Sequence, residues 1–432
     1  MGAVFPAYTP EGDPVDVTLK EAAAVYIPDG YPNTDHPNLG FVLAAHGVDK
    51  VDTGTAATIA RYFGMPVLYH GEYPNWVQAG YTARSDINEA SGKHLARVNR
   101  CIPADYIRGY FPLALAKTDL RAITLLQRLA EQAGGDVQKV ALRGFSKEGK
   151  AAWLAFMVDD RIEVGIPGGS PTGDAQAWGQ FMIKAYGCAE GSELQSKIQS
   201  VADGQVWRSV SPAGAALKEL YGVVENLDLM HPRVFLIDGD VGMWNMHDGI
   251  YDAGTGSDSA FLDGLTSRPW RFVRKATSEQ GADGEDGDLT STTAVPMLGA
   301  ELLASGAGSE ATIFPNITSD SATMSGDSFV ASATTSAAAT AARVWWTWST
   351  DRVFDDRTQA PWTSVAMTAS GAGTWTSPSI AVPAGTVIAW YAEAGNSVTV
   401  GGKPYVRNHA APIRILRPTA DLACTPTPAS CE

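Results

Sequence analysis

The sequence has few cysteines and no long apolar run. Only four cysteines occur in 432 residues, and no stretch approaches the roughly 18 apolar residues of a membrane-spanning helix, so we expect no membrane span. Cys424 and Cys431 bracket a Pro/Thr/Ser-rich tail, and this spacing indicates a small disulfide loop. A metal site at that pair would need two further ligands, and no histidine stands nearby. We therefore expect neither a metal nor a cofactor.

Basic residues are also scarce. Lys and Arg total 32 against 47 Asp and Glu, which gives a formal net charge of −15 at pH 7. Nucleic-acid binding draws on clustered Lys and Arg, so this balance argues against a nucleic-acid partner and favours an acidic, soluble surface.

The compartment is inferred from the cysteines and from the start of the chain. Residues 1–6 lack the basic start and apolar core of a signal peptide, so we expect a mature chain from which such a segment has been removed. Cys101 and Cys188 could form a second bridge, but spacing alone does not decide it. Together with the terminal pair, they favour a secreted or periplasmic protein. An intracellular protein with reduced cysteines is the alternative.

Residues 1–308 have the pattern of an α/β domain. Apolar strands alternate with amphipathic helices, which implies a mostly parallel sheet with helices on both faces. Residues 170–230, rich in Trp, Gly and Ala, form a cap-like insertion in this pattern. The expected strands lie at residues 15–27, 40–47, 65–71, 137–142, 162–166, 232–237 and 270–275, and the expected helices at 55–63, 110–133, 150–158 and 292–303.

From about residue 309 the pattern changes to short alternating strands separated by Gly and Pro turns. We predict a small antiparallel β-sandwich over residues 309–418, with strands at 343–348, 362–367, 386–391 and 412–416, followed by a tail at 419–432. Several tryptophans fall in these strands, namely Trp345, Trp346, Trp348 and Trp375. They are candidates for binding a polymer, but core packing is the expected role of at least half of them.

The stretch Gly144-Phe145-Ser146-Lys147-Glu148-Gly149 has the form of a nucleophile turn. A strand leads into Gly144 and a helix is expected just after Gly149, which would present Ser146 on a sharp strand-to-helix turn. Small residues at 144 and 149 would let the two backbones pass closely. The amide of Lys147, together with one from the loop near His46 and Gly47, would form an oxyanion hole. The spacing G-x-S-x-x-G departs from the commoner G-x-S-x-G.

A serine nucleophile needs a base, usually a histidine oriented by a carboxylate, and this class of fold orders them serine, acid, histidine. Asp240, at the end of the strand 232–237, is the expected acid and is preferred over Asp238. The segment 276–288 after the last strand contains no histidine. His247, in the loop after Asp240, is the candidate base. The acidic run 283–288 fits no calcium loop and is expected to be a solvated turn.

The nucleophile turn and its continuation resemble the PhoPQ-activated pathogenicity-related protein family. The stretch 144–154 is similar to the family pattern G-x-S-K-R-G-W-T-T-W-L, and residues 159–167 are similar to its D-x-R-V and I-x-P. The resemblance implies a secreted or periplasmic α/β-hydrolase with a C-terminal β-domain. Glu148 and Lys150 depart from the pattern. Glucuronoyl esterases carry a related G-C-S-R-x-G-K turn, which implies that Lys147 helps to stabilise the oxyanion.

Two functions follow as hypotheses. The first is a secreted serine esterase or amidase that forms an acyl-enzyme at Ser146 and acts on a small-molecule or polymer substrate. The second is a catalytically impaired binding or signalling protein that keeps the hydrolase scaffold. The serine turn favours the first hypothesis, and the absence of a histidine after the last strand favours the second.

Overall fold

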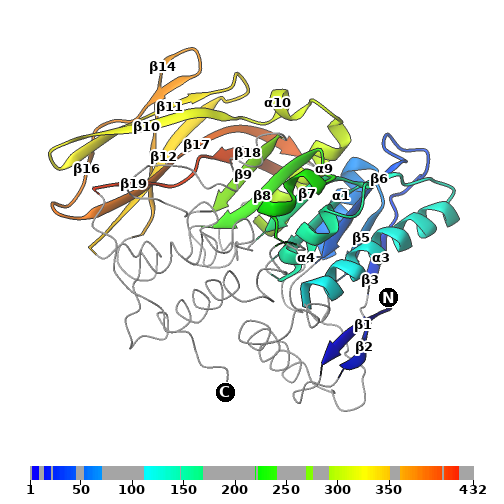
Figure 1. Ribbon diagram of the computed structural model, residues 1–432. Helices are drawn as coiled ribbons and strands as arrows, with labels where there is room; N and C mark the ends of the chain where they lie inside the picture. Colours follow the sequence, from blue (N-terminus) through cyan, green and yellow to red (C-terminus); the bar gives the residue numbers. More distant parts are fainter. Residues whose placement is uncertain are drawn as a thin grey trace.

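The computed structural model describes residues 2–8, 14–20, 23–44, 53–70, 111–145, 147–168, 219, 222–240, 269–275, 291–350, 361–400 and 403–417. Their architecture is a seven-stranded sheet covered by helices, with two antiparallel sheets beside it that face each other (Figure 1). This confirms the predicted α/β layer followed by a β-sandwich. Within the described residues, no helix is both long and apolar enough to cross a membrane.

The large sheet has the strand order β3-β5-β4-β6-β7-β8-β9. All neighbouring pairs are parallel except β3 and β5, which are antiparallel. Parallel strands have their carboxyl ends at one edge of the sheet, so residues that end different strands gather there. The strands are Ala23–Tyr26 (β3), Leu39–Ala44 (β4), Val67–His70 (β5), Lys139–Phe145 (β6), Ile162–Gly168 (β7), Val234–Asp240 (β8) and Trp270–Lys275 (β9).

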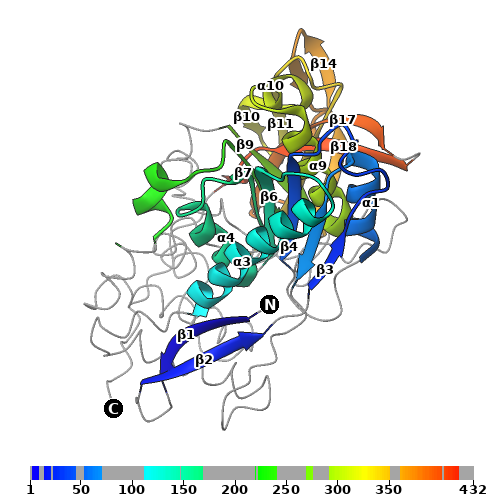
Figure 2. The same cartoon turned by 90° about the vertical axis from the view of Figure 1, so that its right-hand side faces the viewer.

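Helices cover both faces of this sheet. α3 (Phe111–Gln132) and α4 (Lys147–Phe156) pack on one face, and α1 (Thr53–Phe63) and α9 (Ser291–Ser305) pack on the other. Figure 2 shows α3 and α4 side by side on their face. The buried strand residues alternate between the two cores: Leu142 faces α3 and α4, whereas Ala141 faces α1 and α9. Both faces are therefore apolar, as expected for a covered parallel sheet.

The longest helix, α3, follows directly from its sequence pattern. Leu115, Ala122, Ile123 and Leu126 recur at helical spacing and are buried against the sheet. Gly134 then ends the helix with φ +86°, a left-handed conformation that glycine adopts without steric cost. The predicted end of the helix at the glycine pair is confirmed.

The sandwich begins after the short helix α10 (Glu310–Ile313) and consists of two five-stranded antiparallel sheets. One contains β10 (Ile317–Ser325), β11 (Ser328–Thr335), β14 (Thr368–Gly371), β15 (Thr374–Thr376) and β16 (Ile380–Ala381). The other contains β12 (Ala341–Ser349), β13 (Thr363–Ala366), β17 (Val387–Val400), β18 (Lys403–Ala410) and β19 (Arg414–Leu416). The sequence did not predict β10, β11, β14, β15, β16 or β18.

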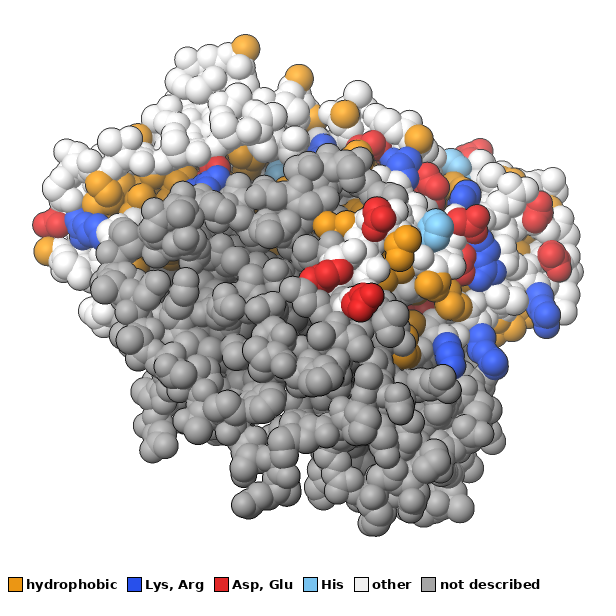
Figure 3. Space-filling view, viewed as in Figure 1, with side chains coloured by type: hydrophobic (Ala, Val, Ile, Leu, Met, Phe, Trp, Pro, Cys, Tyr) orange, Lys and Arg blue, Asp and Glu red, His pale blue; other side chains and the backbone are white. Residues whose placement is uncertain are grey.

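The outer face of β10 and β11 is formed almost entirely by hydroxyl side chains. Ser321 pairs with Ser332 and Ser319 with Thr334, and the row continues to Thr374 and Thr376 on β15. This part of the molecule shows few charged side chains in the space-filling view, whereas charged groups gather over the helices of the large sheet (Figure 3).

The sandwich joins the large sheet through β18 and β9. The backbone N–H of Phe272 in β9 donates a hydrogen bond to Nδ1 of His409 in β18, at 2.9 Å. The ring of Trp270 contacts the same imidazole edge-on, with 5.3 Å between the ring centroids. Arg407 of β18 also forms an ion pair with Glu301 of α9. The imidazole accepts this bond at Nδ1, so Nδ1 carries no proton in this arrangement.

A group of charged residues lies at the edge of the large sheet where the parallel strands begin, opposite their carboxyl ends. Arg233, just before β8, forms ion pairs with Glu163 and with Glu310 of α10. Arg271 is 6% exposed and donates hydrogen bonds to the carbonyl oxygens of Trp270 and Glu310. Burial lowers the pKa of Arg271 to about 10, although the Glu310 carboxylate opposes this shift.

The sandwich tryptophans have mainly structural roles. Trp346 and Trp375 pack against the sandwich core, and the indole N–H of Trp375 donates to Thr335 Oγ1 at 2.9 Å. Trp345 faces the other side of its strand, where it stacks on Tyr391 and lies beside the Arg343 guanidinium. The expectation that at least half of these residues serve packing is confirmed for Trp346 and Trp375.

Candidate active site

The predicted nucleophile turn lies at the carboxyl end of β6, the central strand of the large sheet. β6 ends at Phe145 and α4 begins at Lys147. Ser146, the residue between them, lies outside the described residues. One residue therefore separates strand from helix, which is the context that a nucleophile elbow requires. The prediction that the helix begins after Gly149 was wrong, because Gly149 already lies in the first turn of α4.

Gly144 explains why the helix can start so early. A Cβ atom at this position would lie 2.2 Å from the backbone oxygen of Glu148 and 2.6 Å from its carbonyl carbon. Only glycine lets the first turn of α4 fold back this closely onto its own strand. The predicted close passage of backbones at residue 144 is confirmed, and it fixes where α4 begins relative to β6.

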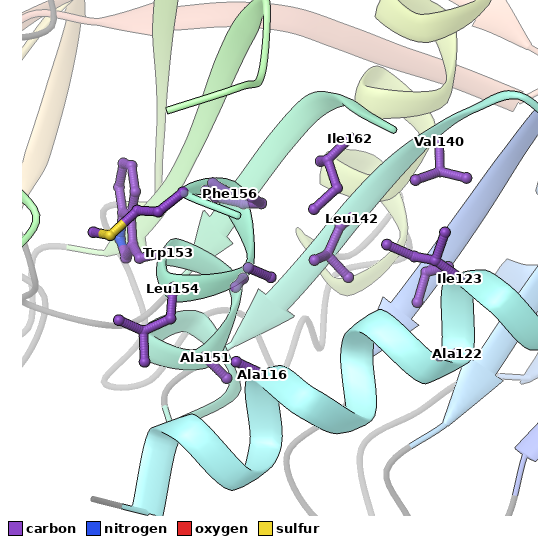
Figure 4. Packing of buried hydrophobic residues seen from close by; sticks show 14 of the residues in the cluster. Ala116, Ala122, Ile123, Val140, Leu142, Ala151, Trp153, Leu154, Phe156 and Ile162 are labelled. Carbon is purple, nitrogen blue, oxygen red and sulfur yellow. The ribbon is translucent and has the colours of Figure 1, made fainter. Parts of the chain in front are cut away.

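The residues flanking the turn are firmly packed. Arg143 is 9% exposed, and its guanidinium carbon lies 5.7 Å from the centre of the Phe145 ring, within the range of a cation–π contact. Glu148, in the first turn of α4, is 6% exposed. Behind them α4 packs against α3 and β6 through Ala151, Leu154 and other apolar side chains (Figure 4). The residues on both sides of the turn are thus packed against the core.

Lys147 is the first residue of α4. Its position places its backbone amide among the first amides of the helix, which have no carbonyl partner within the helix. Such amides and the helix dipole favour negative charge at a helix amino terminus. An oxyanion formed at Ser146 would develop next to this end of α4. The side chain of Lys147 lies outside the described residues.

The predicted acid lies on β8, two strands from β6, at the same edge of the sheet. β8 continues to Asp240, three residues beyond the predicted strand end, and is therefore longer than the sequence indicated. Asp238 pairs with Gly168 of β7 and Asp240 with Lys275 of β9. The backbones of both aspartates therefore lie at the carboxyl edge, but their side chains are outside the described residues. The preference for Asp240 over Asp238 stays a prediction.

Several other predicted residues lie outside the described part of the chain. These are Gly47 and His46 of the expected oxyanion loop, the candidate base His247, and the segment 276–288 after β9. The four cysteines lie there as well, as does the insertion 170–230 except for residues 219 and 222–230. Among the residues described, no group of three or more His, Cys, Asp or Glu side chains could hold a metal ion.

A buried histidine–carboxylate pair lies at the same edge, and the sequence did not predict it as a pair. His70 is the last residue of β5, and its Nε2 lies 3.1 Å from Oδ1 of Asp119 in α3. Neither side chain is exposed. One signal was present in the sequence: Asp119 lies four residues after Leu115 and four before Ile123, on the apolar stripe of α3.

The sheet order, the elbow at the central strand and the helices on both faces together define an α/β-hydrolase fold. A sequence match to the PhoPQ-activated pathogenicity-related protein family extends over residues 106–230. The match includes α3, the nucleophile turn and β7, and it confirms the resemblance drawn from the turn. No curated protein matches the chain in sequence.

Solved structures give more distant similarities. A puromycin-hydrolyzing peptidase from Mycobacterium tuberculosis aligns with 69% of this chain at 15% identity and a TM-score of 0.35, and the alignment spans 38% of that peptidase. An arylesterase aligns with 71% of this chain and 84% of its own at 11% identity and a TM-score of 0.35. Est1E from Butyrivibrio proteoclasticus aligns with 70% and 96% at 11% identity and a TM-score of 0.30.

Proposed function

We propose that this protein is a serine hydrolase that cleaves an ester or amide through an acyl-enzyme at Ser146. The observation that carries the proposal is the strand–turn–helix at β6 and α4, where the Gly144 backbone lies against that of Glu148. An ordinary surface turn has no need of this close approach, whereas a nucleophile elbow depends on it. The position of the elbow on the central strand adds support, because β8 and β9 end at the same edge of the sheet, two and three strands away.

The proposed reaction uses the residues that the sequence predicted. The hydroxyl oxygen of Ser146 attacks the acyl carbonyl while His247, oriented by Asp240, takes the hydroxyl proton. The amides of Lys147 and Gly47 stabilise the resulting oxyanion. The base then gives its proton to the leaving alcohol or amine. Water releases the acyl group by the same steps in reverse, and the serine is restored.

Fluorophosphonate labelling tests this proposal directly. The wild-type protein is expected to label and to hydrolyse a short p-nitrophenyl ester, and Ser146→Ala is expected to lose both. If the wild type neither labels nor hydrolyses, the proposal fails. His247→Ala then tests the base, with His231→Ala as a control, since His231 is an exposed residue just before β8 at the opposite edge of the sheet.

The alternative is a binding or signalling protein that keeps the hydrolase scaffold without catalysis. The absence of histidine from residues 276–288, after β9, favours it. An intact fold that does not label with fluorophosphonate at any pH between about 6 and 9, where a histidine base would be unprotonated in part or in full, would select this alternative.

We also propose that the protein acts in an oxidising compartment, either secreted or periplasmic. The four cysteines support this proposal by their even number and by the terminal pair. Peptide mapping of the protein from its native source, without reduction, should find Cys424 linked to Cys431. Free thiols at both positions would contradict the proposal.

A further inference from the structure

The buried pair of His70 and Asp119 has no part in the reaction proposed above. His70 is the last residue of β5, and Asp119 lies in the middle of α3, on the side that faces the sheet. Their side chains are both 0% exposed, and 3.1 Å separates His70 Nε2 from Asp119 Oδ1. The distance is that of an ion pair, which is fully charged when the imidazole is protonated.

Such a pair is a costly way to join a helix to a sheet. Removing a charged group from water costs several kcal/mol even after relaxation, and apolar residues of similar volume often serve stability equally well. Apart from Thr118 and Asp119, the buried residues of α3 are apolar, including Leu115, Ala122 and Ile123. A buried charged pair at this position therefore points to a geometric role, because an ion pair at 3.1 Å restricts the relative positions of the two groups more than apolar contacts do.

The pair lies in the same row of the sheet as the start of the nucleophile turn. Ala44 of β4 pairs with His70 on one side and with Gly144 on the other. His70 and Gly144 are thus two strands apart, on the order of 10 Å at the usual strand spacing. His70 lies two residues after Leu68 in the strand, so the two side chains lie on the same face of the sheet, the one that carries α3 and α4.

α3 connects the pair to α4. The two helices pack along each other on this face, and Ala116 of α3 lies beside Ala151 of α4 (Figure 4). Because Gly144 has no Cβ atom, the backbone of Glu148, in the first turn of α4, can lie directly against β6. The start of α4 is therefore held from two sides, by its own strand and by α3. The ion pair between Asp119 and His70 joins α3 directly to the sheet.

We propose that His70 and Asp119 are positioning residues for the active site. By fixing α3 at the carboxyl edge of the sheet, they hold the first turn of α4, and with it the Lys147 amide, at the place where the oxyanion forms. The inference rests on the proposed hydrolase function. Neither residue needs to touch the substrate or the reacting atoms.

A double substitution separates positioning from stability. His70→Leu with Asp119→Leu replaces the pair by apolar side chains of similar volume, a change expected to preserve folding. Because a misplacement of about 1 Å can lower a rate by about 10²-fold, we expect kcat and the fluorophosphonate labelling rate to fall by about 10- to 100-fold. KM should change by less than about twofold, since substrate-binding groups are untouched.

The matched control removes a partly buried ion pair at the opposite edge of the sheet. Arg233→Met with Glu310→Leu eliminates the ion pair between β8 and α10, far from the carboxyl ends of the strands. This variant should keep the wild-type kcat even if its melting temperature falls. Equal losses of kcat in the two double variants would show a general effect of destabilisation and overturn the proposal, as would a wild-type labelling rate in the His70/Asp119 variant.

If the double variant fails to fold, two single variants decide. His70→Gln and His70→Met have similar volumes, but only glutamine can donate a hydrogen bond to Asp119. The proposal expects Gln to retain at least about a third of the labelling rate and Met to lose about tenfold or more. Equal rates in both would overturn it. A wild type that does not label at Ser146 would instead overturn the hydrolase function, and this inference with it.

Discussion

The approach between Gly144 and α4 makes the effect of one added methyl group predictable. In Gly144→Ala the new Cβ would lie 2.2 Å from the Glu148 oxygen, whereas real Cβ atoms essentially never come closer than 3.0 Å to such an atom. The first turn of α4 must therefore move away by roughly 0.8 Å, a shift comparable to the 1 Å misplacement that can cost about 10²-fold in rate. We expect kcat and the labelling rate at Ser146 to fall by about that factor.

The stability of Gly144→Ala should fall as well, because overpacking a close contact costs about 1–3 kcal/mol. Urea unfolding gives this number, and labelling below the transition gives the rate on folded protein. Gly299→Ala is the matched control. Its Cβ would lie 2.1 Å from Ile166 Cδ1, a similar overlap, but the partner is the end of a flexible side chain on the face covered by α9.

The control variant should therefore keep its labelling rate. Wild-type labelling by Gly144→Ala, or an equal loss in Gly299→Ala, would refute the argument that Gly144 sets the position of α4 at the active site.

Three further predictions concern stability. Phe235→Ala, at a fully buried side chain, should cost about 3–5 kcal/mol in urea unfolding, while Val158→Ala, at an exposed one, should change stability by less than about 0.5 kcal/mol; similar values for the two would contradict the core assignment. His409→Leu removes the acceptor of the Phe272 N–H and should cost about 1–3 kcal/mol; an unchanged unfolding midpoint would show that the bond does not hold the sandwich. The stability of Arg271→Met relative to the wild type should be highest below pH 10, because the folded-state pKa of Arg271, about 10, lies below its ordinary 12.5. The buried charge penalises the wild type fully at low pH and less as pH rises through 10, so the wild type should gain stability relative to the variant between pH 8 and 10.5; a constant difference would contradict this.

The sequence was most informative where a local pattern decides the structure. The apolar stripe of α3 and the glycine at residue 134 determine that helix and its end, and strong apolar runs determine β4, β5 and β6. The strands β10 and β11 were missed because Ser and Thr alternate with Ala on them, which gives little contrast in hydrophobicity between the two faces. Only pairing with other strands makes such segments extended.

At the candidate site, too, the local pattern was recognised from the sequence, whereas contacts between separate elements were not. The turn at Ser146 was recognised from its own residues, but the start of α4 was misplaced because Gly149 was taken as the helix boundary. The determining residue is Gly144, whose effect depends on a contact with the helix that follows. The pairing of His70 with Asp119 could not be deduced from spacing, because it depends on how α3 lies across the sheet.

The contact between His409 and Phe272 has a further consequence for the large sheet. β9 is the last strand in its order, and an exposed edge strand offers its backbone groups to any other extended chain, which leads to aggregation. Here a domain carried on the same chain covers that edge, with an imidazole taking the place of a ladder partner at Phe272. The sandwich thus covers this edge of the large sheet, and we expect residues 1–308 expressed alone to aggregate more readily than the full chain.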